Sequence, residues 1–349
     1  MKHKKLFALS ILYAAALLSA LTASISFGII PENDDIPAIA PTSVSTPTPT
    51  IVPHGDSEES SDILFFNDET QGYEYMALEQ YICGVLAGEM SANYEKQALM
   101  AQAVAARTYV AYRLWKYENG DTNDLHPDSA VCTDSSHCMA YLSLSSAQEK
   151  WGKDWTDKYW QNIVDAVADT EGEILVYDGE PINALFCAAS CGKTEASIEV
   201  WGGSDVPYLQ SVDSEPDLNS PWSNVSVRFS ENEFKNIFLS QYPDARFPDD
   251  SSDWCTNIVR SDAGYVTGVR IGGVTLTGRT VRKIYGLKSA NFDITVGGGE
   301  IVFTTRGYGH GVGMSQYGAN ELAKSGMGYR DILLKYYTDV EIKKMLFKP

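Results

Sequence analysis

Residues 77–90 read ALEQYICGVLAGEM. The large apolar residues of this stretch recur at the three- and four-residue spacing of one helical face, which predicts an amphipathic helix from Ala77 to Met90. The residues on the predicted buried face are Leu78, Tyr81, Ile82, Val85 and Leu86.

Glu89 lies on the same face, four positions after Val85 and three after Leu86. A carboxylate on a buried face loses solvation, and the end of the helix is the negative end of its dipole. Both effects favour the protonated form and raise the pKa of Glu89, as a general acid requires near neutral pH. The alternative is a boundary Glu that reaches water or pairs with a basic residue.

A second helix is predicted from about Glu95 to Trp115, with an apolar face made of Leu99, Ala103, Val110 and Leu114. Arg107 falls within that face, and a buried Arg needs a partner. A direct pair with Glu89 would lower the pKa of that carboxyl, against the acid role. We therefore expect Arg107 to bind substrate or another acceptor; the alternative is a salt bridge in the core.

The charge balance bears on the class of partner. The chain has 349 residues, of which 46 are acidic and 27 basic, for a net charge of −19. This balance argues against a nucleic-acid partner, which needs a basic surface to neutralise phosphates. Six cysteines in a chain of this length do not make a disulfide-dense scaffold.

The N-terminus predicts a membrane anchor. Residues 1–5 are basic and residues 6–30 carry no charge, a run long enough to cross the ~30 Å hydrocarbon core as a helix. The positive-inside rule makes residues 1–5 a cytoplasmic stub and exports the rest. The alternative is a cleaved secretory signal, because small residues that permit cleavage occur near Ala23. Both alternatives export the main domain.

Residues 31–62 are rich in Pro, Ser, Thr, Asp and Glu, which predicts a disordered linker. Residues 63–349 are predicted to form a single extracytoplasmic catalytic domain of the α+β class, with a helical active-site hairpin packed on mixed strands. Strands are predicted at Glu173–Tyr177 and Ile182–Phe186 around an Asp-Gly turn, and at Glu300–Thr305.

Two polar segments are candidates for sugar binding. The loop after the first pair of strands carries Ser190, Lys193 and Thr194. A glycine-rich loop follows residue 305 but lacks the spacing of a nucleotide-binding loop, so we expect its backbone to approach sugar hydroxyls, with His310 and Gln316 supplying side chains. The alternative for His310 is a tight turn in which the ring is satisfied locally. A helix is expected to begin near Ser315.

Three blocks of sequence occur in order between about Leu78 and Tyr337. The first joins residues 78–90 to residues 98–109, and the second contains Ser190-Cys191-Gly192-Lys193-Thr194, Trp201 and Pro207-Tyr208-Leu209. The third runs from Gly307 to Ala319. In this combination the chain resembles the stage II sporulation protein D family.

The resemblance implies a membrane-anchored lytic transglycosylase that cleaves the glycan strands of peptidoglycan during engulfment in sporulation. It implies Glu89 as the catalytic residue and a preference for strands stripped of their stem peptides. It also implies two partners, stage II sporulation proteins P and M, with protein P as the amidase that strips the peptides. The enzyme would be held by a single pass in the cell membrane and act in the intermembrane space of the sporulating cell.

The residues agree with that chemistry. Hydrolysis of a glycoside usually needs two carboxylates, whereas a lytic transglycosylase can use one. That carboxyl first protonates the glycosidic oxygen and then, as a base, activates the 6-hydroxyl of the muramic acid, which closes on its own C1. No second acid lies near Glu89 between Leu86 and Asn93. A carboxylate from elsewhere in the chain remains the alternative, with hydrolysis as its product.

A candidate metal site follows the second predicted helix. His126, Cys132, His137 and Cys138 lie within thirteen residues in a polar loop. Two thiolates and two imidazoles make a tetrahedral zinc set, and four protein ligands indicate a structural site. The alternatives are a disulfide between Cys132 and Cys138 or unpaired loop residues. No role is assigned to the remaining cysteines, Cys83, Cys187, Cys191 and Cys255.

Two competing functions remain open at this point. The first is a non-catalytic module that binds glycan or stimulates an amidase, and the sequence context of Glu89 argues against it. The second is a zinc amidase or peptidase, which needs an open position on the metal. Four protein ligands would leave none.

Overall fold

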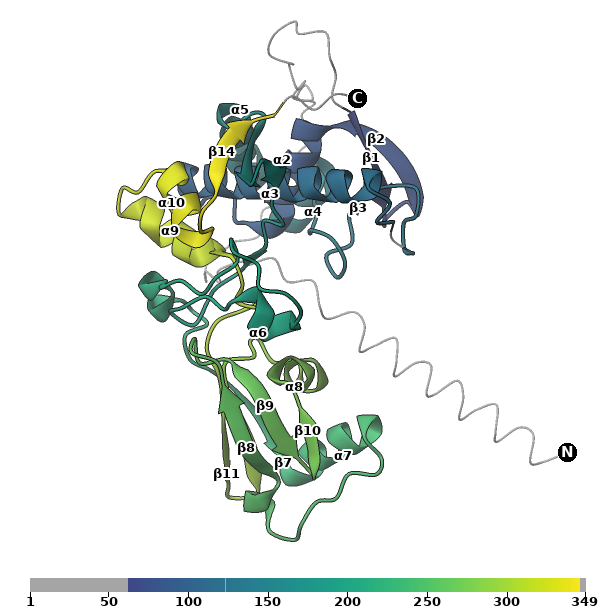
Figure 1. The fold of residues 1–349 in the computed structure, drawn as a ribbon, viewed down its shortest axis with the longest axis vertical. Helices are drawn as coiled ribbons and strands as arrows, with labels where there is room; N and C mark the ends of the chain where they lie inside the picture. Colours follow the sequence, from purple (N-terminus) through teal and green to yellow (C-terminus); the bar gives the residue numbers. More distant parts are fainter. Residues whose placement is uncertain (1–61, 123, 346–349) are drawn as a thin grey trace, which may run out of the picture.

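The computed structural model describes residues 62–122 and 124–345, which form an α+β fold (Figure 1). The predicted cytoplasmic stub, the anchor at residues 6–30 and the linker up to residue 61 lie outside the described residues. Within the described part of the chain, no helix is long and apolar enough to cross a membrane.

The centre of the larger lobe is the predicted helical hairpin, α2 (Leu78–Glu89) and α3 (Lys96–Glu118). The two helices pack with α4 (Leu144–Trp151) and α5 (Lys153–Asp169) around one hydrophobic core. Because its alanines are small, α3 is buried on most sides and also contacts α9 (Gln316–Lys324) and α10 (Tyr329–Tyr336). Both predicted helices are confirmed to within three residues at each end.

Two small sheets border this helical core. β1 (Asp62–Asn67) pairs antiparallel with β2 (Gly72–Ala77) and parallel with β3 (Val131–Cys132). β4 (Glu173–Tyr177) lies between β14 (Glu341–Lys344) and β5 (Glu180–Pro181).

The hairpin of β4 and β5 turns at Asp178 and Gly179, which have φ angles of 50° and 86°. The turn is as predicted, but the predicted strand at 182–186 is wrong. The second strand ends at Pro181. The Ile182 N–H still donates to the Leu175 carbonyl at 3.2 Å, but the Leu175 N–H donates to the Thr108 hydroxyl at 2.9 Å and not back to the strand. The chain forms a new strand only at β6 (Phe186–Cys187).

The smaller lobe, residues 225–305, lies at the lower end of Figure 1. Its strands are β7 (Val225–Ser230), β8 (Cys255–Arg260), β9 (Val266–Ile271), β10 (Val274–Leu276), β11 (Phe292–Gly297) and β12 (Glu300–Thr305). Its helices are α7 (Glu231–Gln241), the short η2 (Ser251–Asp253) and α8 (Gly278–Tyr285). These elements enclose their own core of aromatic and aliphatic side chains. Residues 63–349, predicted as one domain, therefore contain two lobes that the sequence analysis did not separate.

The glycine-rich loop carries the chain from β12 back to the larger lobe. It ends at β13 (Met314–Ser315), which pairs parallel with β6, and α9 begins directly afterwards, as predicted. Gly313 has a φ of 72°, and a Cβ there would lie 1.9 Å from the Leu185 carbonyl oxygen. A side chain at 313 would therefore push the loop off β6. The remaining short elements are α6 (Ser197–Trp201) and η1 (Glu215–Asn219).

Candidate active site between the hairpin and the glycine loop

A pocket of about 710 Å³ opens where the end of α2, the loop after β3 and the glycine-rich loop meet. This volume lies within the range of small-ligand sites, roughly 300–1,000 Å³. The predicted site residues that line the pocket are Glu89, His137, Cys138, His310 and Gln316.

Glu89 is the last residue of α2, and its carboxyl group is held from two sides. The backbone N–H of Ala140 donates to Oε1 at 2.7 Å, and Nε2 of Gln316 donates to Oε2 at 3.4 Å. Ala140 comes so close because Gly88 has no side chain: a Cβ there would lie 2.6 Å from the Ala140 carbonyl carbon. The carboxyl is thus fixed by backbone and still borders the pocket.

Burial raises the pKa of Glu89, while the hydrogen bonds from Ala140 and Gln316 lower it; burial is the largest effect. No ion pair joins Glu89 to a basic residue among the described residues. The raised pKa predicted from the helical face is therefore present in the structure. Two other carboxylates, Asp68 and Asp134, also line the pocket.

Each of those two carboxylates holds a loop. Asp134 accepts hydrogen bonds from both the backbone N–H and the hydroxyl of Ser136, at 2.8 and 2.9 Å. Asp68 accepts from the side chain of Gln71 at 3.0 Å.

Gln316 is positioned by a buried carboxylate that the sequence analysis missed. Asp217 accepts hydrogen bonds from the hydroxyls of Ser190 at 2.5 Å, Ser214 at 2.8 Å and Ser315 at 2.7 Å. It thereby joins three segments that are distant in the chain, and one of them, at Ser315, directly precedes Gln316. Asp217 lies in a short polar helix, η1, whose sequence resembles an ordinary exposed turn, so nothing in it signalled burial.

His310 borders the pocket as a neutral ring. Its Nδ1 accepts a hydrogen bond from the Val312 N–H at 3.1 Å. Burial lowers the pKa of His310 to about 4, and the nearby Arg282 and Arg279 push in the same direction. His310 is therefore suited to shape the pocket, and it is not a base that titrates near neutral pH. Its locally satisfied Nδ1 agrees with the tight-turn alternative.

The four predicted metal ligands lie together. One donor atom from each of His126, Cys132, His137 and Cys138 falls within 4.8 Å of the others. Nε2 of His126 is 3.1 Å from Nδ1 of His137 and 3.7 Å from Sγ of Cys138, and Sγ of Cys132 is 3.5 Å from Nδ1 of His137. Both cysteines are free thiols.

The family was identified by comparison with known proteins. Residues 67–177 match the family described as Stage II sporulation protein. Stage II sporulation protein D of Bacillus subtilis (strain 168) is 36% identical over 283 residues, covering 81% of this chain and 79% of that protein. The protein of the same name from Bacillus amyloliquefaciens is 35% identical over 288 residues, covering 82% and 80%. The chain belongs to the stage II sporulation protein D family.

The family resemblance read from the three blocks is thereby confirmed. A more distant relative is the amidase enhancer of Bacillus subtilis (strain 168), 28% identical over 302 residues, which cover 73% of this chain and 39% of that protein.

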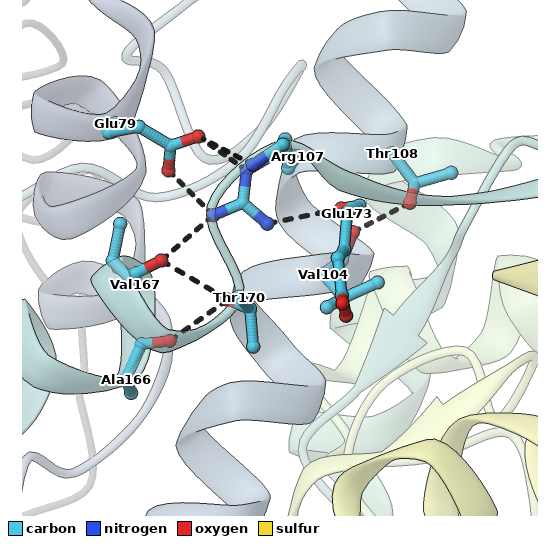
Figure 2. A network of polar contacts seen from close by, with 9 residues as sticks. Glu79, Val104, Arg107, Thr108, Ala166, Val167, Thr170 and Glu173 are labelled. Carbon is cyan, nitrogen blue, oxygen red and sulfur yellow. Dashed lines mark hydrogen bonds and ion pairs between the residues drawn. The ribbon is translucent and has the colours of Figure 1, made fainter. Parts of the chain in front are cut away.

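Arg107, in the first of the family blocks, does not reach the pocket. Its side chain is fully buried, and it donates to both carboxylate oxygens of Glu79, at 2.8 and 2.6 Å (Figure 2). Its remaining N–H groups donate to the carbonyls of Glu173 at 3.1 Å and Val167 at 3.3 Å. Arg107 was expected to bind substrate or another acceptor. The structure contradicts the substrate role and shows the other acceptor, because Arg107 forms the core salt bridge given as the alternative.

The segment with Ser190, Lys193 and Thr194, which was expected to bind sugar, has a structural role in the protein. Ser190 is buried and bonded to Asp217, and the Thr194 hydroxyl is buried between the N–H and carbonyl groups of Val212. The backbone of Lys193 bridges to Asp213. Ser190, Lys193 and Thr194 do not line the pocket. Their polar side chains suggested a ligand, but in Ser190 and Thr194 they serve to satisfy loop backbone in the interior.

Proposed function

We propose that this protein is a lytic transglycosylase that cleaves the glycan strands of peptidoglycan. The observation that carries the proposal is Glu89: a carboxyl with a raised pKa, fixed by Ala140 and Gln316, at the wall of a pocket large enough for sugar rings. Membership of the stage II sporulation protein D family supports the same substrate.

The proposed reaction returns Glu89 to its starting state. The protonated carboxyl gives its proton to the glycosidic oxygen as the bond from that oxygen to C1 of the muramic acid breaks. The carboxylate then takes the proton of the 6-hydroxyl, whose oxygen bonds to C1 of the same sugar. The product is an anhydro sugar, and no water is consumed. Ala140 and Gln316 donate to the two oxygens of the transient carboxylate, which stabilises it.

Single-carboxylate chemistry is supported by the other acids of the pocket. A hydrolase needs a second carboxylate that acts as nucleophile or base. Asp68 and Asp134, which also line the pocket, already accept hydrogen bonds from loop groups. We therefore assign the acid and the base step to Glu89 alone.

The deciding experiment is mass spectrometry of products made from peptide-free glycan strands in water enriched with heavy oxygen. The proposal expects anhydro-ended fragments without the heavy isotope, and none from Glu89→Gln. Fragments with reducing ends that carry heavy oxygen identify a hydrolase instead. In that case Asp68→Asn and Asp134→Asn tell which carboxylate activates the water.

We also propose a structural zinc ion held by His126, Cys132, His137 and Cys138. Tetrahedral zinc with Zn–N of ~2.0 Å and Zn–S of ~2.3 Å sets its ligand atoms roughly 3.3–3.8 Å apart, close to the separations in this cluster. Nδ1 of His126 lies 2.8 Å from the Ser129 carbonyl, the kind of bond that orients a metal-binding imidazole through its other nitrogen. Cys138 is two residues before Ala140, so the ion would fix the loop that contacts Glu89.

The zinc proposal expects about one zinc per chain by elemental analysis. Cys132→Ser or Cys138→Ser should release the ion and lower the free energy of unfolding, because metal binding is coupled to folding. Chelator should act similarly, and reductant alone should not. A metal-free protein whose mass is two protons short for the cysteine pair would establish the disulfide instead.

The biological setting is part of the same proposal. Residues 6–30 would anchor the enzyme by a single pass, with residues 63–349 outside the cytoplasm in the intermembrane space of the sporulating cell. Stage II sporulation proteins P and M are the proposed partners, and strands freed of stem peptides the proposed substrate. Membrane fractionation of the full chain, compared with a chain lacking residues 1–30, tests the anchor.

A second candidate function follows from one relative, named an amidase enhancer. In that case the pocket would bind glycan and stimulate an amidase without cleaving it. Glu89→Gln separates the two functions: it should abolish cleavage by a transglycosylase but leave stimulation of an amidase intact.

A further inference from the structure

A group of cations lies beside the pocket, on the side of the glycine-rich loop. Arg279 and Arg282 belong to α8, and Lys288 follows that helix. Nζ of Lys288 is 4.5 Å from the ring centroid of Tyr308, which lines the pocket, and the backbone carbonyl of Lys288 accepts from the Gly309 N–H at 3.0 Å. Arg279 and Arg282 both act electrostatically on His310, another lining residue.

None of these three cations forms an ion pair within the described residues. Arg282 is half-buried, and Nε donates to the Leu287 carbonyl at 3.3 Å. Burial lowers the pKa of Arg282, and Arg279 contributes to the same shift. Five other arginines among the described residues each pair with a carboxylate: Arg107, Arg228, Arg260, Arg306 and Arg330. In a chain with a net charge of −19, unpaired cations beside a pocket indicate an anionic ligand.

An exposed aromatic ring adjoins the same cations. Trp201 is 44% exposed, and its ring centroid lies 5.3 Å from that of His310 and 5.7 Å from Cζ of Arg279. Arg279 also donates to the Val200 carbonyl at 3.0 Å, which fixes α6 against α8; the two helices are neighbours in Figure 1. The glycines that follow Trp201 face open space. An aromatic face beside cations suits a ligand with both a ring and a negative charge.

On this basis we propose that Arg282 and Lys288, with Arg279 and Trp201 beside them, bind the lactyl carboxylate of a peptide-free muramic acid. The inference rests on the proposed function, since it names the part of the glycan that the pocket recognises. N-acetylglucosamine is neutral, and muramic acid in a strand carries one carboxylate, on its lactyl group. A stem peptide converts that carboxylate into a neutral amide.

Selectivity for stripped strands follows from this charge. A free lactyl carboxylate pairs with the cations, whereas an amide leaves them desolvated without a partner. The reaction that supplies the substrate must therefore be hydrolysis of the amide between the lactyl group and the peptide. Steric exclusion of the peptide is the competing explanation, and it predicts no dependence on charge.

The experiment compares two substrates of nearly equal size. One is peptide-free glycan; the other is the same glycan with its lactyl carboxylates coupled to methylamine. We expect wild-type kcat/KM to fall about tenfold on the amide, which corresponds to ~1.4 kcal/mol, less than many charge-assisted hydrogen bonds contribute. In Lys288→Gln the two substrates should differ less than threefold, mainly because the free-acid strand is cleaved more slowly.

Lys235→Gln is the matched control. Lys235 is also half-buried over aromatic rings, with Nζ 5.7 Å from the ring centroid of Phe247, but it lies in α7 away from the pocket. It should keep the tenfold ratio. Arg282→Gln provides a second test of the pocket cations, with its thermal unfolding measured to establish folding.

Two outcomes overturn the subsite. One is an equal preference for both strands in the wild type; the other is a tenfold preference that persists in both Lys288→Gln and Arg282→Gln. If the wild type cleaves neither strand, the proposed function fails instead. Binding of the two strands by the full chain then decides the subsite, since only a carboxylate site holds the free-acid strand more tightly in the wild type than in Lys288→Gln.

Discussion

The two ends of α2 carry two carboxylates with opposite fates. Glu79, in the first turn, pairs with the fully buried Arg107, which also donates to the carbonyls of Val167 and Glu173 (Figure 2). Glu89, in the last turn, faces the Ala140 N–H and the Gln316 amide, and burial raises its pKa.

Whether a cation lies beside it separates the roles of these two half-buried carboxylates. A guanidinium favours the ionised form and fixes its geometry, which stabilises a fold. Neutral donors hold a carboxyl in place without removing its ability to carry a proton. The helix dipole acts in the same sense, because it favours a negative charge at the first turn and disfavours it at the last.

The largest expected effect is that of Glu89→Gln on catalysis. Gln keeps the shape but cannot transfer a proton, so the rate on peptide-free glycan should fall at least ~10²-fold. Glu79→Gln should keep its rate per folded molecule within a few-fold. Product formation by both variants, normalised to folded protein, checks the contrast, and an active Glu89→Gln would remove Glu89 from the mechanism.

The same two variants differ in how stability depends on pH. Because the pKa of Glu89 is raised in the folded state, its stabilising contribution is present at low pH and is lost as pH rises through that pKa. Wild type should therefore lose stability relative to Glu89→Gln as pH rises from about the ordinary Glu pKa, ~4.3, toward neutrality. Denaturant unfolding across this pH range measures the difference. Wild type that instead gains stability relative to Glu89→Gln as pH rises would show that the pKa of Glu89 is lowered in the fold.

The next largest effect concerns the other end of the helix. Arg107→Met leaves Glu79 without its cation and removes one donor each from the carbonyls of Glu173 and Val167. It should cost about 3 kcal/mol of unfolding free energy, the low end for a broken buried pair. Lys96→Met is the control on the same helix, because Lys96 and its partner Asp169 are 52% and 49% exposed, and it should change little. A stable Arg107→Met with impaired substrate binding would restore the substrate role predicted from the sequence.

The hydrophobic periodicity of the sequence predicts features that depend on a single helix. It predicted α2 and α3, and it placed both Glu89 and Arg107 on buried faces. It could not pair Arg107 with Glu79 rather than with a ligand, because the choice depends on how α2 and α3 are aligned and on the carbonyls that α5 and β4 contribute. The four residues of the metal cluster were found from local spacing for the same reason.

Contacts between segments far apart in the chain could not be predicted from the sequence. The Asp217 carboxylate accepts hydrogen bonds from the hydroxyls of Ser190, Ser214 and Ser315. No local sequence pattern indicates that any of these serines is its partner. Arg282 is noticed only in the folded structure, where no described residue pairs a carboxylate with it. The polar residues from Ser190 to Thr194 suggested sugar binding, but the hydroxyls of Ser190 and Thr194 form hydrogen bonds in the protein interior.

The last and smallest change concerns the hydrogen bond between Gln316 and Glu89. Gln316→Leu removes one of the two groups that donate to Glu89, a hydrogen bond that lowers the pKa of the carboxyl. The pKa should therefore rise further. A general acid is active while protonated, so the alkaline limb of the pH–rate profile should move to higher pH. The maximal rate should fall only a few-fold, because Ala140 still holds Oε1 at 2.7 Å. A structural role alone for Gln316 would lower the rate at every pH and leave the limb in place. A limb that moved to lower pH would mean that the Gln316 amide does not stabilise the Glu89 carboxylate, and that another group holds it.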